Sequence, residues 1–100
     1  MFPVENVQGV FFGSLFYKEF ITTRTSISGA IVNKSKTCYK FLGLEGTLWN
    51  DKNQPIANHY LPIQNVDAGQ TVSFSMIPEV PITEALKLIL RIRFLSGDKC

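Results

Sequence analysis

The sequence predicts an all-β domain in which about six or seven antiparallel strands form a sandwich. Residues 71–77 and 86–95 alternate between apolar and polar side chains, as strands with one buried face do. Strand-like segments recur at intervals of roughly 8–14 residues, separated by clusters of Gly, Pro and Asn. A chain of 100 residues is large enough for one hydrophobic core, and no linker interrupts it, so we expect a single domain over residues 1–100.

The composition is that of an ordinary globular protein, with 45% hydrophobic and 18% charged residues. The net charge of +2 is too small to indicate nucleic-acid binding by itself. No apolar stretch reaches the roughly 18 residues of a membrane-spanning helix, and residues 1–5 lack the features of a signal peptide. The compartment is left open, with a lean toward the cell envelope or the exterior, which would require that a leader or anchor had been removed.

Residues 10–23 carry aromatic side chains on both alternating faces, so a period of two is not clean there. The spacing of Phe12, Leu15, Phe16, Glu19 and Phe20 would also suit a helix. The β-branched run at residues 21–23 and the glycine at position 13 favour a strand. We therefore expect a strand and keep a helix as the alternative.

Two strands are expected next, at residues 26–33 and 38–49. In the first, Ile27, Gly29 and Ile31 share one face, and a polar turn at residues 33–36 follows. In the second, Gly43 and Gly46 predict a bulge or bend. The inward residues of the second strand are Leu42, Leu44 and Leu48.

Residues 56–63 read as a weaker strand, which Pro62 assigns to a sheet edge because proline lacks the N–H of a ladder hydrogen bond. Gly69 is expected in the following turn, because glycine takes a positive φ at little cost. In the next strand Val72, Phe74 and Met76 point one way, and prolines at positions 78 and 81 end the pattern.

The C-terminal segment "EALKLILRIRFLSGDKC" permits two interpretations, a basic amphipathic helix on a membrane or a strand with one face in the core. A period of two fits better, because helical spacing would scatter its apolar residues around the helix. Lys87, Arg91 and Arg93 then form a basic outer face, and Gly97 ends the strand. The expected core of the whole domain is Ile27, Ile31, Leu42, Leu44, Leu48, Val72, Phe74, Leu86, Leu88, Leu90 and Ile92.

Three stretches, "SGAIVNKSK", "LGLEGTLWNDKNQPI" and "LPIQNVDAGQTVSFSM", resemble the FxLYD domain and its relatives among the late-embryogenesis-abundant type 2 proteins. Gly29, Ile31 and Asn33 fill the G-x-V-x-N step of that pattern. The Leu-Trp-Asn at residues 48–50 stands in the place of its Leu-Tyr-Asp motif, and residues 68–74 match its later glycine-to-phenylalanine step. The resemblance covers roughly residues 25–95.

The sequence departs from that pattern at Gly46, where the family has an aromatic residue, and at Trp49 and Asn50 in place of Tyr and Asp. The resemblance implies an immunoglobulin- or fibronectin III-like antiparallel sandwich. It also implies a non-catalytic module, often on the bacterial or archaeal envelope. From their residue types alone, Asn33 and Asn50 suit turns, and Trp49 suits a strand end where its ring is buried.

Few residues suggest catalysis. His59 is the only histidine, and no GxSxG motif supplies the partners of a nucleophilic triad. The carboxylates are scattered singly, and no glycine-rich phosphate loop is present. We therefore expect no enzyme and no cofactor.

Cys38 and Cys100 could form one disulfide, but we favour two unrelated thiols because Cys100 lies at the C-terminal end, where order is doubtful. No CxxC motif accompanies them, so a zinc site is not expected. The sequon that begins at Asn33 would accept a glycan only in a secretory setting.

Two surfaces are candidates for binding. The aromatic set near the N-terminus is either an interface, with a second copy or another protein, or part of the core, and both interpretations have equal weight. That set is Phe11, Phe12, Phe16, Tyr17 and Phe20. The leading interpretation of the chain is a non-enzymatic interaction or structural module of an envelope-associated or extracellular protein. The alternative is an OB-like nucleic-acid-binding domain that uses the basic face of Lys87, Arg91 and Arg93.

Overall fold

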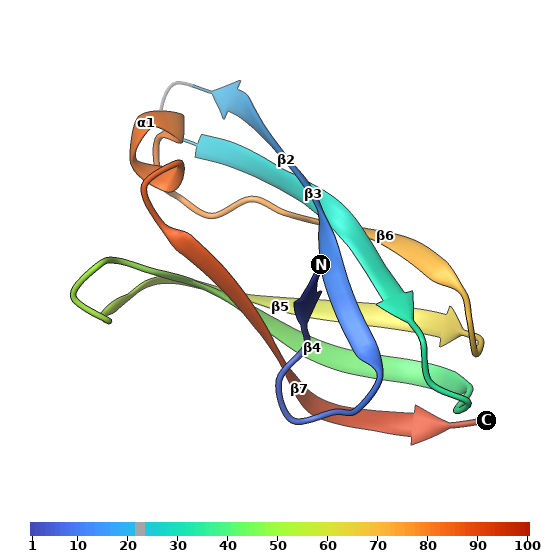
Figure 1. The fold of residues 1–100 in the computed structure, drawn as a ribbon. Coiled ribbons are helices and arrows are strands. Elements are labelled where there is room, and N and C mark those ends of the chain that lie inside the picture. Colours follow the sequence, from blue (N-terminus) through green and yellow to red (C-terminus); the bar gives the residue numbers. More distant parts are fainter. Residues whose placement is uncertain (22–23) are drawn as a thin grey trace.

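The computed structural model describes residues 1–21 and 24–100, apart from the side chains of residues 20 and 21, and consists of two antiparallel sheets packed face to face (Figure 1). The first sheet has the order β1-β2-β3-β6 and the second has the order β5-β4-β7. A single helical turn, α1, precedes the last strand. The bounds are β1 Phe2–Pro3, β2 Val10–Ile21, β3 Arg24–Asn33, β4 Tyr39–Trp49, β5 Pro55–Val66, β6 Thr71–Met76, α1 Ile82–Ala85 and β7 Ile89–Lys99.

The predicted β-sandwich is confirmed, whereas an immunoglobulin-like strand order is not. In constant-type immunoglobulin domains the second strand of the chain lies between the first and the fifth. Here β2 lies between β1 and β3, because β2–β3 and β4–β5 are hairpins that each stay within one sheet. The chain crosses between the sheets after β3, β5 and β6.

β2 is a strand, as expected, and its irregular pattern has a structural cause. Ser14 adopts a positive φ of 53°, and the pairing with β3 shifts its register between Gly13 and Phe16. This bulge inserts an extra residue into β2, so the residues that face the core have even numbers before the bulge and odd numbers after it. Val10 and Phe12 are buried before the bulge, and Leu15 and Tyr17 pack against the core after it. Thr22 and Thr23, which favoured a strand, lie outside the described residues.

The C-terminal strand is confirmed, but its start and end were wrong. Residues 82–85 form a helical turn after Pro81, and the strand begins only at Ile89 and continues through Gly97. Leu86 ends that turn and is 63% exposed, so its assignment to the core is corrected. The physical reason is that the chain crosses here from one sheet to the other, where strand periodicity does not apply. Leu88 is half-buried, and Leu90 and Ile92 are buried as predicted.

The middle strands follow the predicted pattern. Leu42, Leu44 and Leu48 of β4 have no exposed surface, and β5, which contains Pro62, lies at a sheet edge. Gly69 takes a φ of 80° in the turn before β6. Of the remaining predicted core residues, Ile27, Ile31 and Phe74 are buried. Val72 is half-buried.

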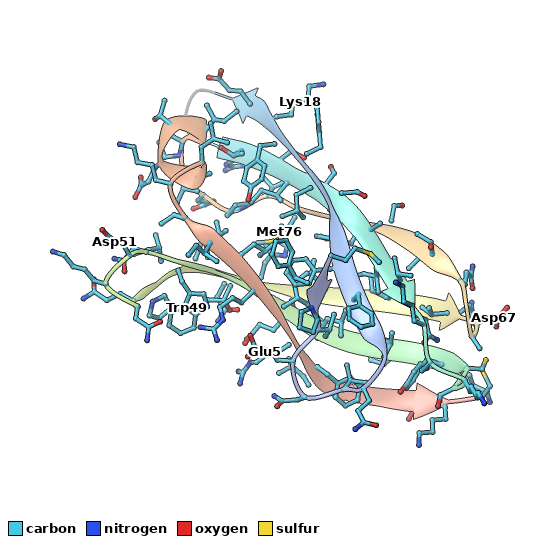
Figure 2. All side chains as sticks on the ribbon, in the orientation of Figure 1. Glu5, Lys18, Trp49, Asp51, Asp67 and Met76 are labelled. Atoms are coloured by element: carbon cyan, nitrogen blue, oxygen red, sulfur yellow. A yellow bond between two sulfur atoms is a disulfide. The ribbon has the colours of Figure 1, made fainter. Side chains whose placement is uncertain are left out.

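Gly46 is buried on the core side of β4. A Cβ atom at this position would lie 3.1 Å from the Sδ atom of Met76. Figure 2 places Met76 between the sheets, where it is 1% exposed. A larger side chain at position 46 would therefore have to displace Met76.

Asn33 joins three loops at one end of the sandwich. Its side chain is fully buried, and its Nδ2 donates to the carbonyl oxygens of Thr37 at 2.8 Å and Asp67 at 3.2 Å. Its Oδ1 accepts from the backbone N–H of Ser35 at 3.1 Å. The next N–H, of Lys34, donates to the carbonyl of Gly9 at 2.7 Å. Because the amide is enclosed and fully bonded, the sequon is not open to glycosylation in the folded domain.

A disulfide between Cys38 and Cys100 lies at the same end, so the expectation of two unrelated thiols was wrong. The backbone N–H of Cys100 also donates to the carbonyl of Cys38 at 3.0 Å, which continues the pairing of β4 with β7. The bridge spans 62 residues of sequence, a loop whose closure in the unfolded chain corresponds to about 4 kcal/mol of stabilisation. We call residues 33–38, 67–70 and 100 the closed end.

We predict that Asn33→Ala lowers the free energy of unfolding by about 2–4 kcal/mol, because the carbonyl groups of Thr37 and Asp67 and the N–H of Ser35 lose their bonds to the buried Asn33 amide. Urea denaturation followed by circular dichroism measures this loss. Asn50→Ala is the matched control, since Asn50 also bonds its own turn but in an exposed loop, and about 1 kcal/mol or less is expected. Equal losses in the two variants would contradict the assigned role of Asn33.

Candidate functional site

A cleft of about 580 Å³ opens at the side of the sandwich between β2 and β7. We call it the edge cleft. Its walls come from segments far apart in the sequence. The apolar and aromatic residues used in the argument below are Phe2, Leu15, Tyr17, Trp49, Leu88 and Ile89. Figure 1 shows β2 and β7 on the two sheets, with the short β1 beside β2. The size is within the range of about 300–1,000 Å³ that is typical of ligand sites.

The cleft is open because the N-terminal segment covers only part of this side. β1 pairs with β2 only at Phe11 and Phe12, and the ring of Phe2 packs on that of Phe12 with centroids 5.4 Å apart. The chain then reaches β7, where the backbone carbonyl oxygen of Glu5 accepts from the N–H of Phe94 at 2.8 Å. Beyond Gly13, β2 pairs only with β3 in the part of the chain that the structure describes.

Exposed apolar side chains lie at the mouth of the edge cleft. Phe2 is 58% exposed and Ile89 is 62% exposed, and both line it. Leu86 is as exposed as Ile89 but does not line it. Clustered exposed apolar residues beside a cleft are typical of binding surfaces rather than of ordinary surface positions.

Polar groups border the same cleft at the β4–β5 turn. Asn50 and Asn53 line it, and the Oδ1 of Asn50 accepts from the N–H groups of Lys52 and Gln54, both at 2.9 Å. These bonds hold the turn in one conformation. Figure 2 shows this turn, marked by Asp51, at the opposite end of the molecule from Asp67 and the closed end.

Tyr17 is a half-buried titratable residue of β2. Burial against the core raises the pKa of its phenol above 10.0, because the low-dielectric surroundings disfavour the phenolate. Its side chain lines the edge cleft. It therefore presents a neutral hydroxyl there at physiological pH.

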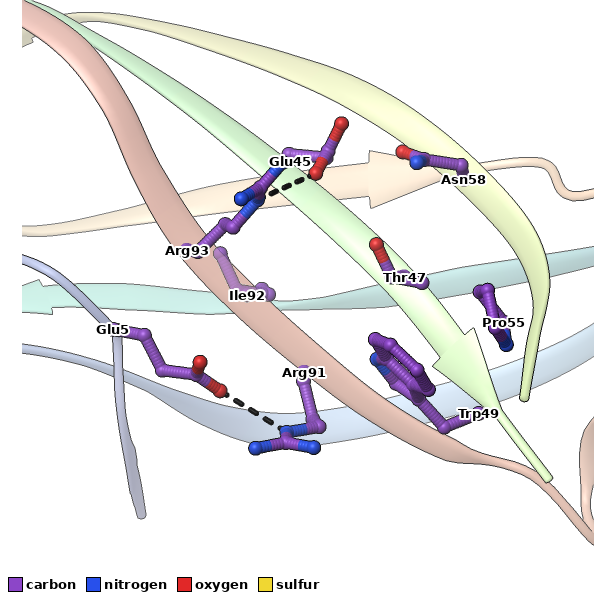
Figure 3. Close-up of a pocket in the computed structure, with 9 residues that line it drawn as sticks. All are labelled: Glu5, Glu45, Thr47, Trp49, Pro55, Asn58, Arg91, Ile92 and Arg93. Atoms are coloured by element: carbon purple, nitrogen blue, oxygen red, sulfur yellow. Dashed lines mark hydrogen bonds and ion pairs between the residues drawn. The ribbon is translucent and has the colours of Figure 1, made fainter. Parts of the chain in front are cut away.

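A second hollow, of about 420 Å³, lies on the outer face of the sheet β5-β4-β7 (Figure 3). We call it the sheet groove. Arg93 Nε donates to Glu45 Oε1 at 2.7 Å, and Arg91 Nε donates to Glu5 Oε2 at 3.1 Å. The guanidinium of Arg91 also lies 5.6 Å from the ring centroid of Trp49.

The predicted basic face is therefore neutralised where it lies on β7. Arg91 and Arg93 point outward as expected, but each is paired with a carboxylate. Lys87 lies between α1 and β7, outside the strand. The three cations thus do not form a continuous positive stripe.

The predicted aromatic set is divided among several environments. Phe12 is 2% exposed and belongs to the core, and Tyr17 faces the edge cleft. Phe11 is half-buried, with the Nζ of Lys34 5.4 Å from its ring centroid. Phe16 lies opposite Ser28 on the outer face and is 62% exposed. The side chain of Phe20 lies outside the described residues.

Three possible metal ligands, Cys38, Cys100 and Asp67, come within 4.8 Å of one another. Both sulfurs belong to the disulfide, so neither is a thiolate, and a thiolate is what a metal ion requires from cysteine. His59 Nδ1 lies 3.2 Å from the carbonyl oxygen of Tyr60, with no carboxylate or hydroxyl partner among the hydrogen bonds of the described residues. These groups do not form a catalytic arrangement.

The edge cleft itself was not predicted from the sequence. Its walls come from β1, β2, the β4–β5 turn and the start of β7, and no local motif links these segments. One signal was present: Phe2 and Ile89 are large apolar residues that the expected core did not include.

Comparison with known proteins gave no match to a family model, to a curated protein or to a solved structure. The resemblance to the FxLYD domain therefore stays a prediction. Within the described part of the chain, none of the helical residues forms a segment with the length and hydrophobicity needed to cross a membrane.

We predict that the Tyr17 phenol ionises later than a free tyrosine when the pH is raised, because its pKa is raised by burial. Between pH 10 and that raised pKa the unfolded chain loses its proton and the folded chain does not, so this group lowers the stability as the pH rises. Comparison of Tyr17→Phe with the wild type in urea at pH 8 and about 10.5 isolates this contribution. Parallel slopes for the two proteins would show that Tyr17 is not buried.

Proposed function

We propose that the chain is a non-catalytic interaction module that binds an extended segment of a partner protein in the edge cleft. The partner backbone lies along the edge of β2 beyond the bulge, and its apolar side chains fill the cleft. The observation that carries the proposal is that an apolar cleft lies beside a strand edge which β1 covers only at its start. Addition of a strand to an exposed edge is a common mode of peptide recognition.

The chemistry of the edge cleft favours a peptide over a lipid. Leu15, Tyr17 and Leu88 provide an apolar floor, while Asn53 provides an amide with both donors and an acceptor. A peptide group also carries one donor and one acceptor, so it matches this rim. Arg91 is already paired with Glu5 and offers little free charge to an anionic lipid.

Features of β2 favour a different protein over a second copy of this chain. The bulge at Ser14 and the exposed charges of Lys18 and Glu19 are devices that disfavour pairing of identical edges. A partner strand that pairs with β2 only after Ser14 does not meet the bulge. The expected contact on β2 is therefore at residues 15–19.

The disulfide supports a place outside the reducing cytoplasm, since such bonds persist in the cell envelope or the exterior. Nucleic acid is a weaker candidate as the ligand, because the two arginines of the outer face are paired with carboxylates. An interaction module of an envelope or extracellular protein is consistent with both observations.

We predict that peptides selected from a phage-displayed random library against the folded domain carry apolar residues at alternate positions, as a bound strand requires. Ile89→Glu is expected to weaken their affinity about tenfold or more, because a carboxylate at the cleft mouth must lose water when the peptide binds. Fluorescence anisotropy with labelled peptides measures the dissociation constants.

Leu86→Glu is the matched control, since Leu86 is 63% exposed and Ile89 is 62% exposed, and only Ile89 lines the edge cleft. Both variants should keep the melting temperature of the wild type, and Leu86→Glu should keep its affinity. Failure to select any peptide, or equal affinity for Ile89→Glu and the wild type, would refute the proposal.

A further inference from the structure

The sheet groove is lined by equal numbers of acidic and basic side chains. Its charged residues comprise two carboxylates, of Glu5 and Glu45, and two guanidinium groups, of Arg91 and Arg93. They are joined in pairs, so their charges cancel. A phosphate ion would have to compete with the carboxylates for the arginines, and an ammonium group would have to compete with the arginines for the carboxylates. The site is therefore suited to a neutral polar ligand.

The ion pairs also leave hydrogen-bonding capacity. Each joins one Nε–H to one carboxylate oxygen, while a guanidinium has further N–H donors and a carboxylate has further acceptor sites. Pairing holds these side chains in place, which lowers the entropy lost when a ligand binds. Thr47 and Asn58 line the groove with a hydroxyl and an amide. A polyol suits such a site, because each of its hydroxyl groups is a neutral donor and acceptor of hydrogen bonds.

Trp49 gives the groove an aromatic wall. Its ring is half-buried at the end of β4 and lines the hollow together with Pro55, as Figure 3 shows. The C–H groups of a pyranose ring form a flat apolar surface that packs against an indole ring, while the sugar hydroxyls bond to polar side chains around it. A volume of about 420 Å³ is within the range of small-ligand sites.

We propose that the sheet groove binds a neutral saccharide. The pyranose packs beside Trp49, and its hydroxyl groups bond to Thr47, Asn58 and the paired side chains of Glu45 and Arg93. This site is on the outer face of the sheet, whereas the proposed peptide segment occupies the edge cleft. The two proposals do not depend on each other.

Intrinsic fluorescence tests this proposal directly, because Trp49 is the only tryptophan of the chain. The probes are D-glucose, D-galactose, N-acetyl-D-glucosamine, cellohexaose and chitohexaose, with inorganic phosphate and D-glucuronate as charged counterparts. We expect at least one neutral saccharide to change the emission saturably. We expect the charged compounds to bind about tenfold more weakly or not at all.

Thr47→Val is the decisive variant, since it removes one hydroxyl, keeps the side-chain shape and suits a strand. It should weaken saccharide binding about fivefold, the loss of one hydrogen bond. Thr71→Val, at an exposed position of β6, is the matched control and should bind as the wild type does. Unchanged emission with every neutral probe, or equal affinities of Thr47→Val and the wild type, would overturn the proposal.

Trp49, Glu5 and Arg91 also line the edge cleft, so the two sites must be separated by variants. Ile89→Glu should lose peptide binding and keep saccharide binding, and Thr47→Val should do the reverse. A saccharide whose binding is lost with Ile89→Glu and kept with Thr47→Val would lie in the edge cleft. That result would overturn the assignment to the sheet groove and leave peptide binding to be judged by its own experiment.

Discussion

The buried amide of Asn33 is the interaction on which the arrangement of the chain depends. β3 belongs to one sheet and β4 to the other, and Asn33 stands where the chain crosses between them. Its amide bonds to the loop that follows it and to the β5–β6 turn. Its neighbour Lys34 bonds to the segment before β2. Since the side chain of Asn33 is fully buried, its hydrogen bonds hold these loops in one relative position.

This closed end has a consequence for the rest of the molecule. The disulfide fixes the last residue of the chain to the start of β4, so the end of β7 cannot move away from its sheet. In the part of the chain that the structure describes, the N-terminal segment covers the side of the sandwich only near Phe12 and Ile92. The edge cleft remains between the uncovered parts of β2 and β7. The closed end thus stabilises the fold, whereas the proposed binding site lies in the edge cleft.

The regular strands could be predicted because a sheet with one buried face imposes a period of two on the sequence. β6 is an example, in which Val72, Phe74 and Met76 face inward and alternate with exposed Thr and Ser residues. β2 did not show this period, because the extra residue at Ser14 exchanges its faces, and a bulge with a serine at positive φ has no clear sequence signature. The turn at residues 82–85 was not predicted, and Leu86, which ends it, was assigned to the strand because it has the same parity as Leu88 and Leu90.

The proposed functional features were harder to predict from the sequence than the fold. The ion pairs of the sheet groove join Arg91 to Glu5 and Arg93 to Glu45, which are far apart in the sequence, so the basic strand face looked unpaired. The disulfide joins residues 62 positions apart, and nothing local distinguishes it from two free thiols. Such long-range pairs follow from the topology of the sheets, and periodicity within a strand does not encode them.

The central claim is that one end of the sandwich is closed and that the side between β2 and β7 is open. Amide hydrogen exchange followed by mass spectrometry on the oxidised wild-type protein tests it most directly, because exchange reports local opening. We expect slower exchange at the hydrogen-bonded amides of Asn33, Lys34, Gly69 and Gln70 than at residues 14–19 and 86–89. Equal protection of the two regions, or faster exchange at Asn33 and its loop partners, would contradict this account.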